Sequence, residues 1–216
     1  MKAGPSEATL RPNNAVANDM KALPELVVLD TCVLISTILK NLILRLAESG
    51  LFQPIWAEYI GEEWRRNASR IWDTSPALIE AEWQAMQQAF PQANMGIVNV
   101  FEADLSKSDP KDFHVIAAGR AALAAFPGKS ACILTRNLRD FNRSELRQHG
   151  LSLLSPDEFL VLCHERDPER FVQLLALIPD DAVAIGRPVE PLETVLRRER
   201  LFRLNNLLMQ DAGTEV

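Results

Sequence analysis

The sequence LVVLDTCVLI, residues 26–35, predicts a buried strand that ends on a single acid. Its first four residues are apolar, uncharged and partly β-branched, which is typical of a strand buried on both faces of a parallel sheet. Asp30 follows at the carboxyl end of this strand, where open α/β sheets place their ligands. Apolar residues then recur at the helical period as far as Ala47, so Asp30 also suits a helix cap. Asp30 is therefore either a functional carboxylate or an N-cap.

The composition limits the classes of function. The chain has 216 residues, of which 47% are hydrophobic, and a formal net charge of −6. Proteins that rely on non-specific attraction to phosphates are usually basic, so a nucleic-acid role here requires local basic patches or a bound cation. The N-terminal segment lacks the apolar core of a signal peptide, and no run is long enough to span a membrane. We expect a cytoplasmic protein with three reduced, buried cysteines.

Strand and helix signals alternate along the chain, which predicts an α/β fold with a doubly wound parallel sheet flanked by helices. Residues 1–23 are polar and predict a flexible tail, residues 24–165 the α/β domain, and residues 166–216 a C-terminal helical extension. Within the extension, residues 191–209 predict one basic amphipathic helix. The expected strands are residues 26–29, 51–55, 96–101, 131–135 and 151–154.

Three acids are expected to meet at one edge of the sheet. Asp30 and Asp140 both follow buried strands, and Asp112 begins a helix whose preceding strand ends at the same edge. Like charges held close are costly unless a cation neutralises them, and oxygen ligands suit Mg²⁺ or Mn²⁺. Such a cation is the usual equipment for phosphodiester hydrolysis. The alternative is structural: Asp109 and Asp112 also suit helix caps, and Asp140 a turn.

Four segments together resemble the PIN-domain family, and most closely its bacterial VapC-like toxins. They are residues 28–34 (VLDTCVL), 62–67 (EEWRRN), 109–118 (DPKDFHVIAA) and 134–141 (LTRNLRDF), and the resemblance covers roughly residues 26–160. It implies a sheet in the order 3-2-1-4-5 and an endoribonuclease that depends on Mg²⁺ or Mn²⁺. It further implies a toxin of a type II toxin–antitoxin system, with RNA as substrate and an antitoxin protein as partner. PIN domains of this kind often form homodimers.

The resemblance also assigns roles to individual residues. Asn137 matches the polar residue of the last motif, and Asp109 matches an accessory acid. Cys32 departs from the pattern, because the family more often has Asn there. The four catalytic acids of the family fall on Asp30, Glu63, Asp112 and Asp140, and the metal ligands among them are Asp30, Asp112 and Asp140.

Helical geometry selects Glu63 over its neighbour Glu62 by a separate argument. Successive helical residues are rotated by about 100°. Ile60 and Trp64 mark the buried face of this helix, which leaves Glu62 on the far side and Glu63 at the border. Several arginines flank the acidic motifs and are predicted to hold the RNA backbone, although they could equally be solvated: Arg65, Arg66, Arg136 and Arg139.

Other classes of protein with an acid at a strand end fit less well. A haloacid-dehalogenase-type phosphatase needs a second Asp two residues after the first, where this chain has Cys32. A response-regulator receiver domain needs an Asp after its third strand and a Lys after its fifth, and neither is present. The remaining alternative is a catalytically silent PIN-like scaffold that binds RNA or a partner. Retention of four mutually repelling acids argues against such a scaffold.

Overall fold

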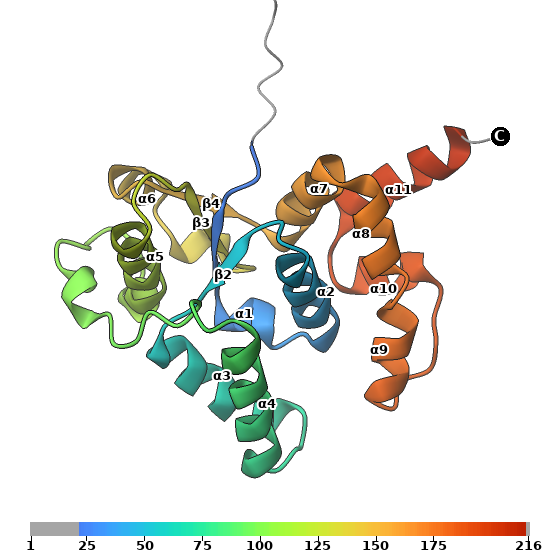
Figure 1. Cartoon of the computed structure of the whole chain (residues 1–216), viewed down its shortest axis with the longest axis horizontal. Helices are drawn as coiled ribbons and strands as arrows, with labels where there is room; N and C mark the ends of the chain where they lie inside the picture. Colours follow the sequence, from blue (N-terminus) through green and yellow to red (C-terminus); the bar gives the residue numbers. More distant parts are fainter. Residues whose placement is uncertain (1–21, 215–216) are drawn as a thin grey trace, which may run out of the picture.

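A parallel sheet of four short strands forms the centre of the protein (Figure 1), seen here in a computed structural model that describes residues 22–214. Every residue of the two central strands is buried, as expected where helices cover both faces. Pro54 lies in an edge strand, where its missing N–H is tolerated. In the order β2-β1-β3-β4, the strands are β2 (Gln53–Ile55), β1 (Leu26–Leu29), β3 (Ala131–Leu134) and β4 (Leu151–Leu154).

The predicted strand at residues 96–101 is wrong, so the sheet lacks the outermost strand of the order 3-2-1-4-5. This segment contains a short 3₁₀ helix, η1 (Asn99–Glu102), and the Phe101 carbonyl accepts a hydrogen bond from the Arg120 side chain instead of a strand. Ile97 and Val100 point to solvent, with 81% and 78% of their surfaces exposed. The segment is apolar in composition, but Ile97 and Val100 are not buried in a sheet as the strand prediction requires. The other four strands keep the predicted neighbours.

Helices cover both faces of the sheet and confirm the α/β class. In Figure 1, α5 (Phe113–Ala125) lies on one side of the sheet, and α2 (Thr37–Glu48) and α7 (Pro156–Arg166) lie on the other. Helix α7 begins with a reciprocal capping box between Ser155 and Glu158. The remaining helices of this part are α1 (Thr31–Leu34), α3 (Glu58–Ile71), α4 (Pro76–Ala89) and α6 (Arg143–Gln148).

Helices α3 and α4 form a hairpin that projects from the sheet (Figure 1). Gly61 allows their close approach, because a Cβ atom there would lie 2.3 Å from the Trp83 ring. The Trp83 ring also packs against Trp64 of α3, with ring centroids 5.9 Å apart. This packing fixes the rotation of α3 and therefore the direction in which its acids point.

The C-terminal extension consists of short helices, and the single helix predicted at residues 191–209 is wrong. The chain breaks at Glu199–Leu201, where Arg200 adopts a positive φ of 61°. The break allows Leu196 and Leu201 to be buried together while Glu199 turns inward. In order, the helices are α8 (Pro168–Leu175), α9 (Ile178–Ala184), α10 (Leu192–Arg198) and α11 (Phe202–Thr214).

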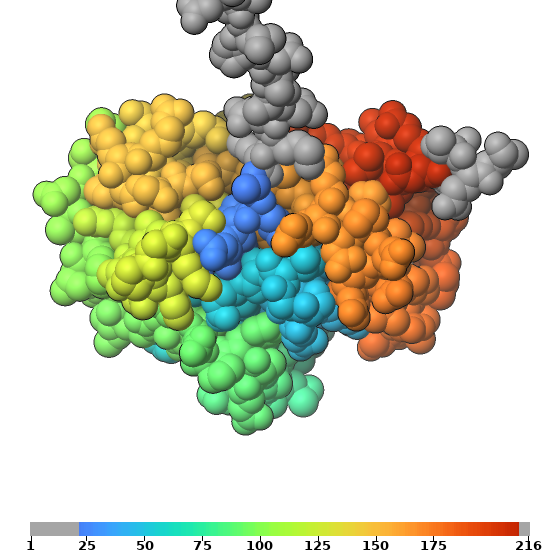
Figure 2. All heavy atoms as spheres, turned by 45° about the horizontal axis from the view of Figure 1, so that its top comes forward, coloured from blue at the N-terminus to red at the C-terminus, as the bar shows by residue number. Residues whose placement is uncertain are grey.

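Polar contacts fasten the extension to the α/β domain. The buried Asp181 accepts two hydrogen bonds from the Arg45 guanidinium, at 2.6 and 2.7 Å. The Asp157 carboxylate accepts the backbone N–H groups of Arg203 and Leu204, which begin α11. In Figure 2 the extension, coloured orange to red, forms one side of the molecule.

Two further expectations concern the N-terminal tail and the absence of a membrane-spanning segment. The tail predicted at residues 1–23 falls outside the described residues, apart from Ala22 and Leu23. Among the described helices, none has the length and apolar character needed to cross a membrane.

Candidate active site

Asp30 lies at the end of β1 and is held by side chains of the neighbouring strand end. It occupies the N-cap position of α1, yet its side chain makes no capping hydrogen bond. Instead, Oδ2 accepts a hydrogen bond from Thr135 Oγ1 at 2.6 Å and one from Cys32 Sγ at 3.1 Å. Only 4% of the Asp30 surface is exposed. The helix-cap alternative for Asp30 is therefore wrong.

The register of the sheet explains why Thr135 reaches Asp30. Leu29 of β1 pairs with Leu134 of β3, so the residues that follow them lie side by side. Thr135 was missed as a functional residue, although it stands at the end of its strand as Asp30 does at the end of β1. A prediction of strand register would have found it.

Cys32 joins the same network and was also missed as a partner of Asp30. Its sulfur lies 3.3 Å from Thr135 Oγ1 and accepts the backbone N–H of Arg136 at 3.2 Å. Burial, reinforced by the charge of Asp30, raises the pKa of the Cys32 thiol to about 12. The thiol is therefore neutral at pH 7 and able to donate a hydrogen bond to the Asp30 carboxylate.

Glu63 points toward this site and Glu62 does not, as the helical rotation predicts. Glu62 is exposed, whereas Glu63 is half-buried and accepts a hydrogen bond from Thr31 Oγ1 at 2.9 Å. The Nε2 atom of the buried His114 lies 3.7 Å from Glu63 Oε2, slightly too far for a direct hydrogen bond. The neighbouring His114 imidazole, and then the Thr31 hydroxyl, lower the pKa of Glu63 below its usual value.

Asp112 and Asp140 share the site with Asp30. Burial, and then the charges of Asp30, Asp140 and Asp109 in that order, together raise the pKa of Asp112 to about 6. Asp112 ends the 3₁₀ helix η2 (Pro110–Asp112), and Asp140 ends η3 (Leu138–Asp140). The Asp109 N–H donates to the Asp140 carbonyl at 2.8 Å, which ties the two acidic loops together.

The predicted cap role applies to one acid of this loop. The exposed Asp109 side chain accepts the Lys111 N–H at 3.0 Å, as an N-cap does. Asp112 occupies the N-cap position of α5, but its side chain makes no capping bond. The Asp112 carboxylate is therefore free to face the other acids.

Glu145 supports the loop that leads into these acids, and sequence reasoning missed it. It is 2% exposed and accepts the N–H groups of Ser106, Lys107 and Ser108 as well as the Ser108 hydroxyl, at 2.6–2.9 Å. Burial would raise the pKa of Glu145, but these hydrogen bonds outweigh it and lower the pKa to about 2. A buried acid beside a helix cap gives no sequence signal that distinguishes it from an exposed one.

The acids fit a divalent cation by their chemistry. Within residues 22–211, no Lys or Arg forms an ion pair with Asp30, Asp112 or Asp140, so no neighbouring Lys or Arg offsets their mutual repulsion. In the same residues no three His, Cys, Asp or Glu side chains are arranged as a formed metal-binding group. Mg²⁺ keeps several waters and needs only one or two protein carboxylates, so a loose cluster of hard oxygen donors suits it.

The four arginines predicted to bind RNA separate into two groups. Arg65 forms ion pairs inside the α3–α4 hairpin, at 3.0 and 3.6 Å, and Arg136 pairs with Glu199 of the extension. Arg66 and Arg139 are exposed and form no ion pair with any described residue. The second pair therefore remains available to a ligand, while the first has structural partners. Asn137, also exposed, donates its backbone N–H to Thr135 Oγ1.

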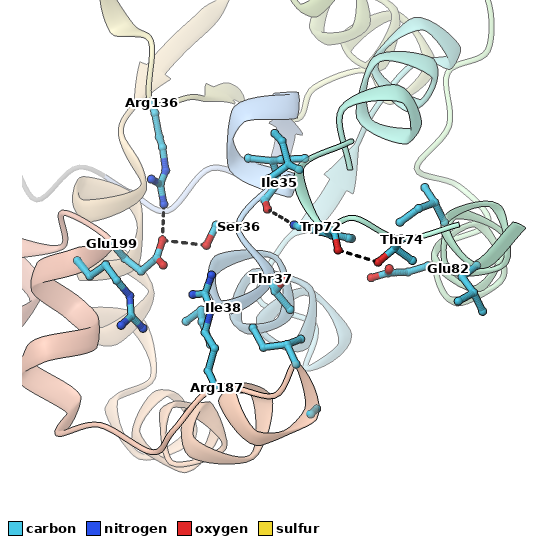
Figure 3. Close-up of a pocket in the computed structure, with 16 residues that line it drawn as sticks. Ile35, Ser36, Thr37, Ile38, Trp72, Thr74, Glu82, Arg136, Arg187 and Glu199 are labelled. Atoms are coloured by element: carbon cyan, nitrogen blue, oxygen red, sulfur yellow. Dashed lines mark hydrogen bonds and ion pairs between the residues drawn. The ribbon is translucent and has the colours of Figure 1, made fainter. Parts of the chain in front are cut away.

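A cavity of about 700 Å³ is lined by residues that follow Asp30 and Thr135 in the chain, among them Ile35 and Arg136 (Figure 3). It is bounded by the start of α2, the α3–α4 hairpin and the extension. None of Asp30, Glu63, Asp112 or Asp140 lines it, but Arg136 does. The acid cluster at the strand ends is therefore distinct from this cavity.

Comparison with known families agrees with this arrangement. A family model described as the PIN domain matches residues 26–139, which is more than half of the chain. The matched range starts with β1 and ends one residue before Asp140, so it contains three of the four catalytic acids expected from the sequence. No curated protein matches the chain, and no solved structure does.

Proposed function

Because this chain belongs to the PIN-domain family, we propose that it is an endoribonuclease that requires Mg²⁺ or Mn²⁺ and acts as the toxin of a type II toxin–antitoxin system. PIN domains are generally nucleases that use divalent metal ions. The restriction to RNA, the choice of metal and the toxin role are the proposed parts.

The observation that carries the nuclease proposal is the cluster of Asp30, Asp112 and Asp140, with which no described Lys or Arg forms an ion pair. Burial, and then the charges of Asp30, Asp140 and Asp109, raise the pKa of Asp112 to about 6. A protein gains nothing in stability from such repulsion, so the cluster has a functional explanation. A scaffold that only binds RNA or a partner would not need it.

In this proposal three acids bind the cation and a fourth, Glu63, accepts a proton. Asp30, Asp112 and Asp140 would hold the cation, which would supply Lewis-acid polarisation of the phosphodiester and a more acidic water. Thr135 and Cys32 fix the Asp30 carboxylate by hydrogen bonds to one oxygen. Thr31 fixes Glu63 through Oε2, which leaves Oε1 to accept a proton from the attacking water. Arg66 and Arg139 would contact the RNA backbone.

The test is cleavage of single-stranded RNA by the purified chain with Mg²⁺ or Mn²⁺. We expect cleavage that EDTA stops and that Asp30→Asn abolishes without loss of fold, because the variant removes one ligand charge and keeps the shape. Binding of Mg²⁺ or Mn²⁺ measured by calorimetry should weaken in the same variant. Cleavage by folded Asp30→Asn at the wild-type rate would refute the metal site, and RNA binding without cleavage in either metal would favour the scaffold.

The toxin role has a test in cells. Induction of the chain alone should arrest growth, while induction of Asp30→Asn should not. A small open reading frame for a DNA-binding antitoxin is expected immediately upstream, and co-expression of its product should restore growth. The cytoplasmic location and a homodimer belong to the same proposal. Growth arrest by both the wild type and Asp30→Asn would show that toxicity does not depend on cleavage, and would contradict the proposed toxin mechanism.

A further inference from the structure

The cavity between the α/β domain and the extension has the size of a ligand site. Its volume of about 700 Å³ falls within the roughly 300–1,000 Å³ of typical ligand pockets. One wall comes from residues 35–38 and the α3–α4 hairpin with Trp72, and the opposite wall from the extension with Ala184, Arg187 and Glu199 (Figure 3). The cavity therefore exists only because the extension is packed against the domain.

Arg187 is the lining cation with no counter-charge. Arg136 is paired with Glu199, and Arg198 is paired with Glu190. Glu82, on the opposite wall, is neutralised by the buried Lys40. No described residue forms an ion pair with Arg187, whose side chain points into the cavity in Figure 3. The cavity thus carries an uncompensated positive charge on a protein whose net charge is −6.

The cavity adjoins the acid cluster through two segments. Ile35, in the cavity wall, is the C-cap of α1, and Asp30 is the N-cap of the same helix. A helix of this length spans about 6 Å. Arg136 lines the cavity with its side chain, while its backbone N–H binds Cys32, a partner of Asp30. An RNA strand bound at the acids would therefore lie about the length of α1, roughly 6 Å, from the edge of the cavity.

We propose that this cavity binds the sugar–phosphate backbone of single-stranded RNA next to the bond that is cleaved, with Arg187 contacting a phosphate. The inference rests on the proposed function and assigns its substrate a path. The free positive charge favours an anionic RNA strand over a protein segment. The wall also offers the Thr37 hydroxyl, which donates to no described residue, to a phosphate or ribose oxygen. The strand would run from the acids into the hollow made by the extension.

The test compares two cavity variants with a matched charge control. Arg187→Ala removes the free cation, Ala184→Trp fills the hollow without changing charge, and Arg170→Ala removes an exposed arginine of α8 that does not line the cavity. Binding of a short labelled single-stranded RNA is measured as a function of salt in the Asp30→Asn background, which prevents cleavage. Steady-state cleavage is measured in the wild-type background, and melting temperatures check the fold.

We expect the log–log salt slope of binding to become shallower by about 0.7 in Arg187→Ala, the value for one lost phosphate contact on a single strand. Ala184→Trp should weaken binding at all salt concentrations. Arg187→Ala should raise KM with little change in kcat, because Arg187 contacts a neighbouring phosphate and not the cleaved bond itself. If the wild type cleaves RNA but both cavity variants bind and cleave as Arg170→Ala does, the cavity proposal is overturned and the nuclease proposal stands. If the wild type neither binds nor cleaves RNA, the nuclease proposal itself fails.

Discussion

Asp112 occupies a position in which its negative charge is unfavourable. Its pKa of about 6 lies above the value of about 3.9 expected for the unfolded chain, because of burial and then of the neighbouring acids. The folded state therefore binds a proton at Asp112 more tightly than the unfolded state does. It follows that the Asp112 contribution to the free energy of unfolding is lost as the pH rises from about 4 to about 6.

Asp112→Asn should stabilise the metal-free protein at pH 7, because it removes the repelled charge. We expect the free energy of unfolding to rise by roughly 1–3 kcal/mol at pH 7 and to change little near pH 4, where Asp112 is protonated in the folded state. Denaturant unfolding in EDTA measures both. Asp109→Asn is the control: Asp109 is exposed, acts as a cap and is the weakest of the charges that raise the Asp112 pKa, so it should give a much smaller gain. An Asp112→Asn variant that is less stable at pH 7 would contradict the shared acidic site.

Glu63→Gln and Glu62→Gln form a matched pair one residue apart on α3. Glu63 accepts a hydrogen bond from Thr31 and faces His114, whereas Glu62 is exposed. Glu63→Gln should lower kcat by roughly a hundredfold or more, the scale of lost proton transfer, with little change in melting temperature. Glu62→Gln should leave cleavage unchanged. Equal losses from both variants would mean that the rotation of α3 differs from the one described.

At the level of residues, the sequence indicates the acids better than their partners. Asp30 could be predicted because a buried apolar run ends on it, and Glu63 because two apolar neighbours define the helix face. Thr135 could not be assigned to Asp30, because that contact joins residues 105 apart and depends on strand register. The pairing of Arg136 with Glu199 was missed for the same reason, since it depends on how the extension packs.

The loop at residues 106–108 depends on one buried carboxylate. Glu145 has a folded pKa of about 2, below its unfolded value, because hydrogen bonds from this loop outweigh the effect of burial. The stability that it contributes is fully present above pH about 4.5 and is lost as the pH falls toward 2. This loop leads directly to Asp109 and Asp112, so the anchor also fixes the acidic site.

Glu145→Ala should destabilise the protein at pH 7 by roughly 1–3 kcal/mol, because it leaves three loop N–H groups, including that of the buried Ser108, without their acceptor. The difference from the wild type should shrink as the pH approaches 2, and kcat should fall because the acids after the loop lose their support. Thermal unfolding as a function of pH measures the first effect. Glu165→Gln, at an exposed position of α7, is the control and should be silent. A difference that stays constant down to pH 2 would show that the carboxylate charge is not the cause.

At the level of elements, the two wrong predictions have the same origin. Residues 96–101 have the composition of a strand but place Ile97 and Val100 in solvent, and residues 191–209 have the pattern of one helix but break at Arg200. In both segments tertiary contacts override the local preference: the Arg120 side chain captures the Phe101 carbonyl, and Glu199 turns inward. By contrast, α7 begins with a capping box formed by its own residues, so its start depends on local contacts alone.

For the molecule as a whole, the extension and the α/β domain form one packed body. Asp181 pairs with Arg45 of α2, Glu199 with Arg136 after β3, and Asp157 of α7 begins α11. Each contact joins a different element of the α/β domain to a different part of the extension. Several apolar side chains of the extension are also buried: Val195, Leu196, Leu201 and Leu204.

Truncation at Pro188 should therefore destabilise the α/β domain. The truncation removes α10 and α11, and with them buried apolar side chains that each contribute roughly 1.5–3 kcal/mol, so we expect a loss of several kcal/mol. That is a large part of the 5–15 kcal/mol that holds a typical domain folded. It also releases Arg136 from Glu199 and leaves Asp157 without the N–H groups it caps, so cleavage should fall as well.

Truncation after Met209 is the control, because it leaves these buried residues and contacts in place. Melting temperature, oligomeric state and RNA cleavage are the readouts, and a Pro188 truncation that matches the Met209 truncation in all three would show that the extension is an independent appendage.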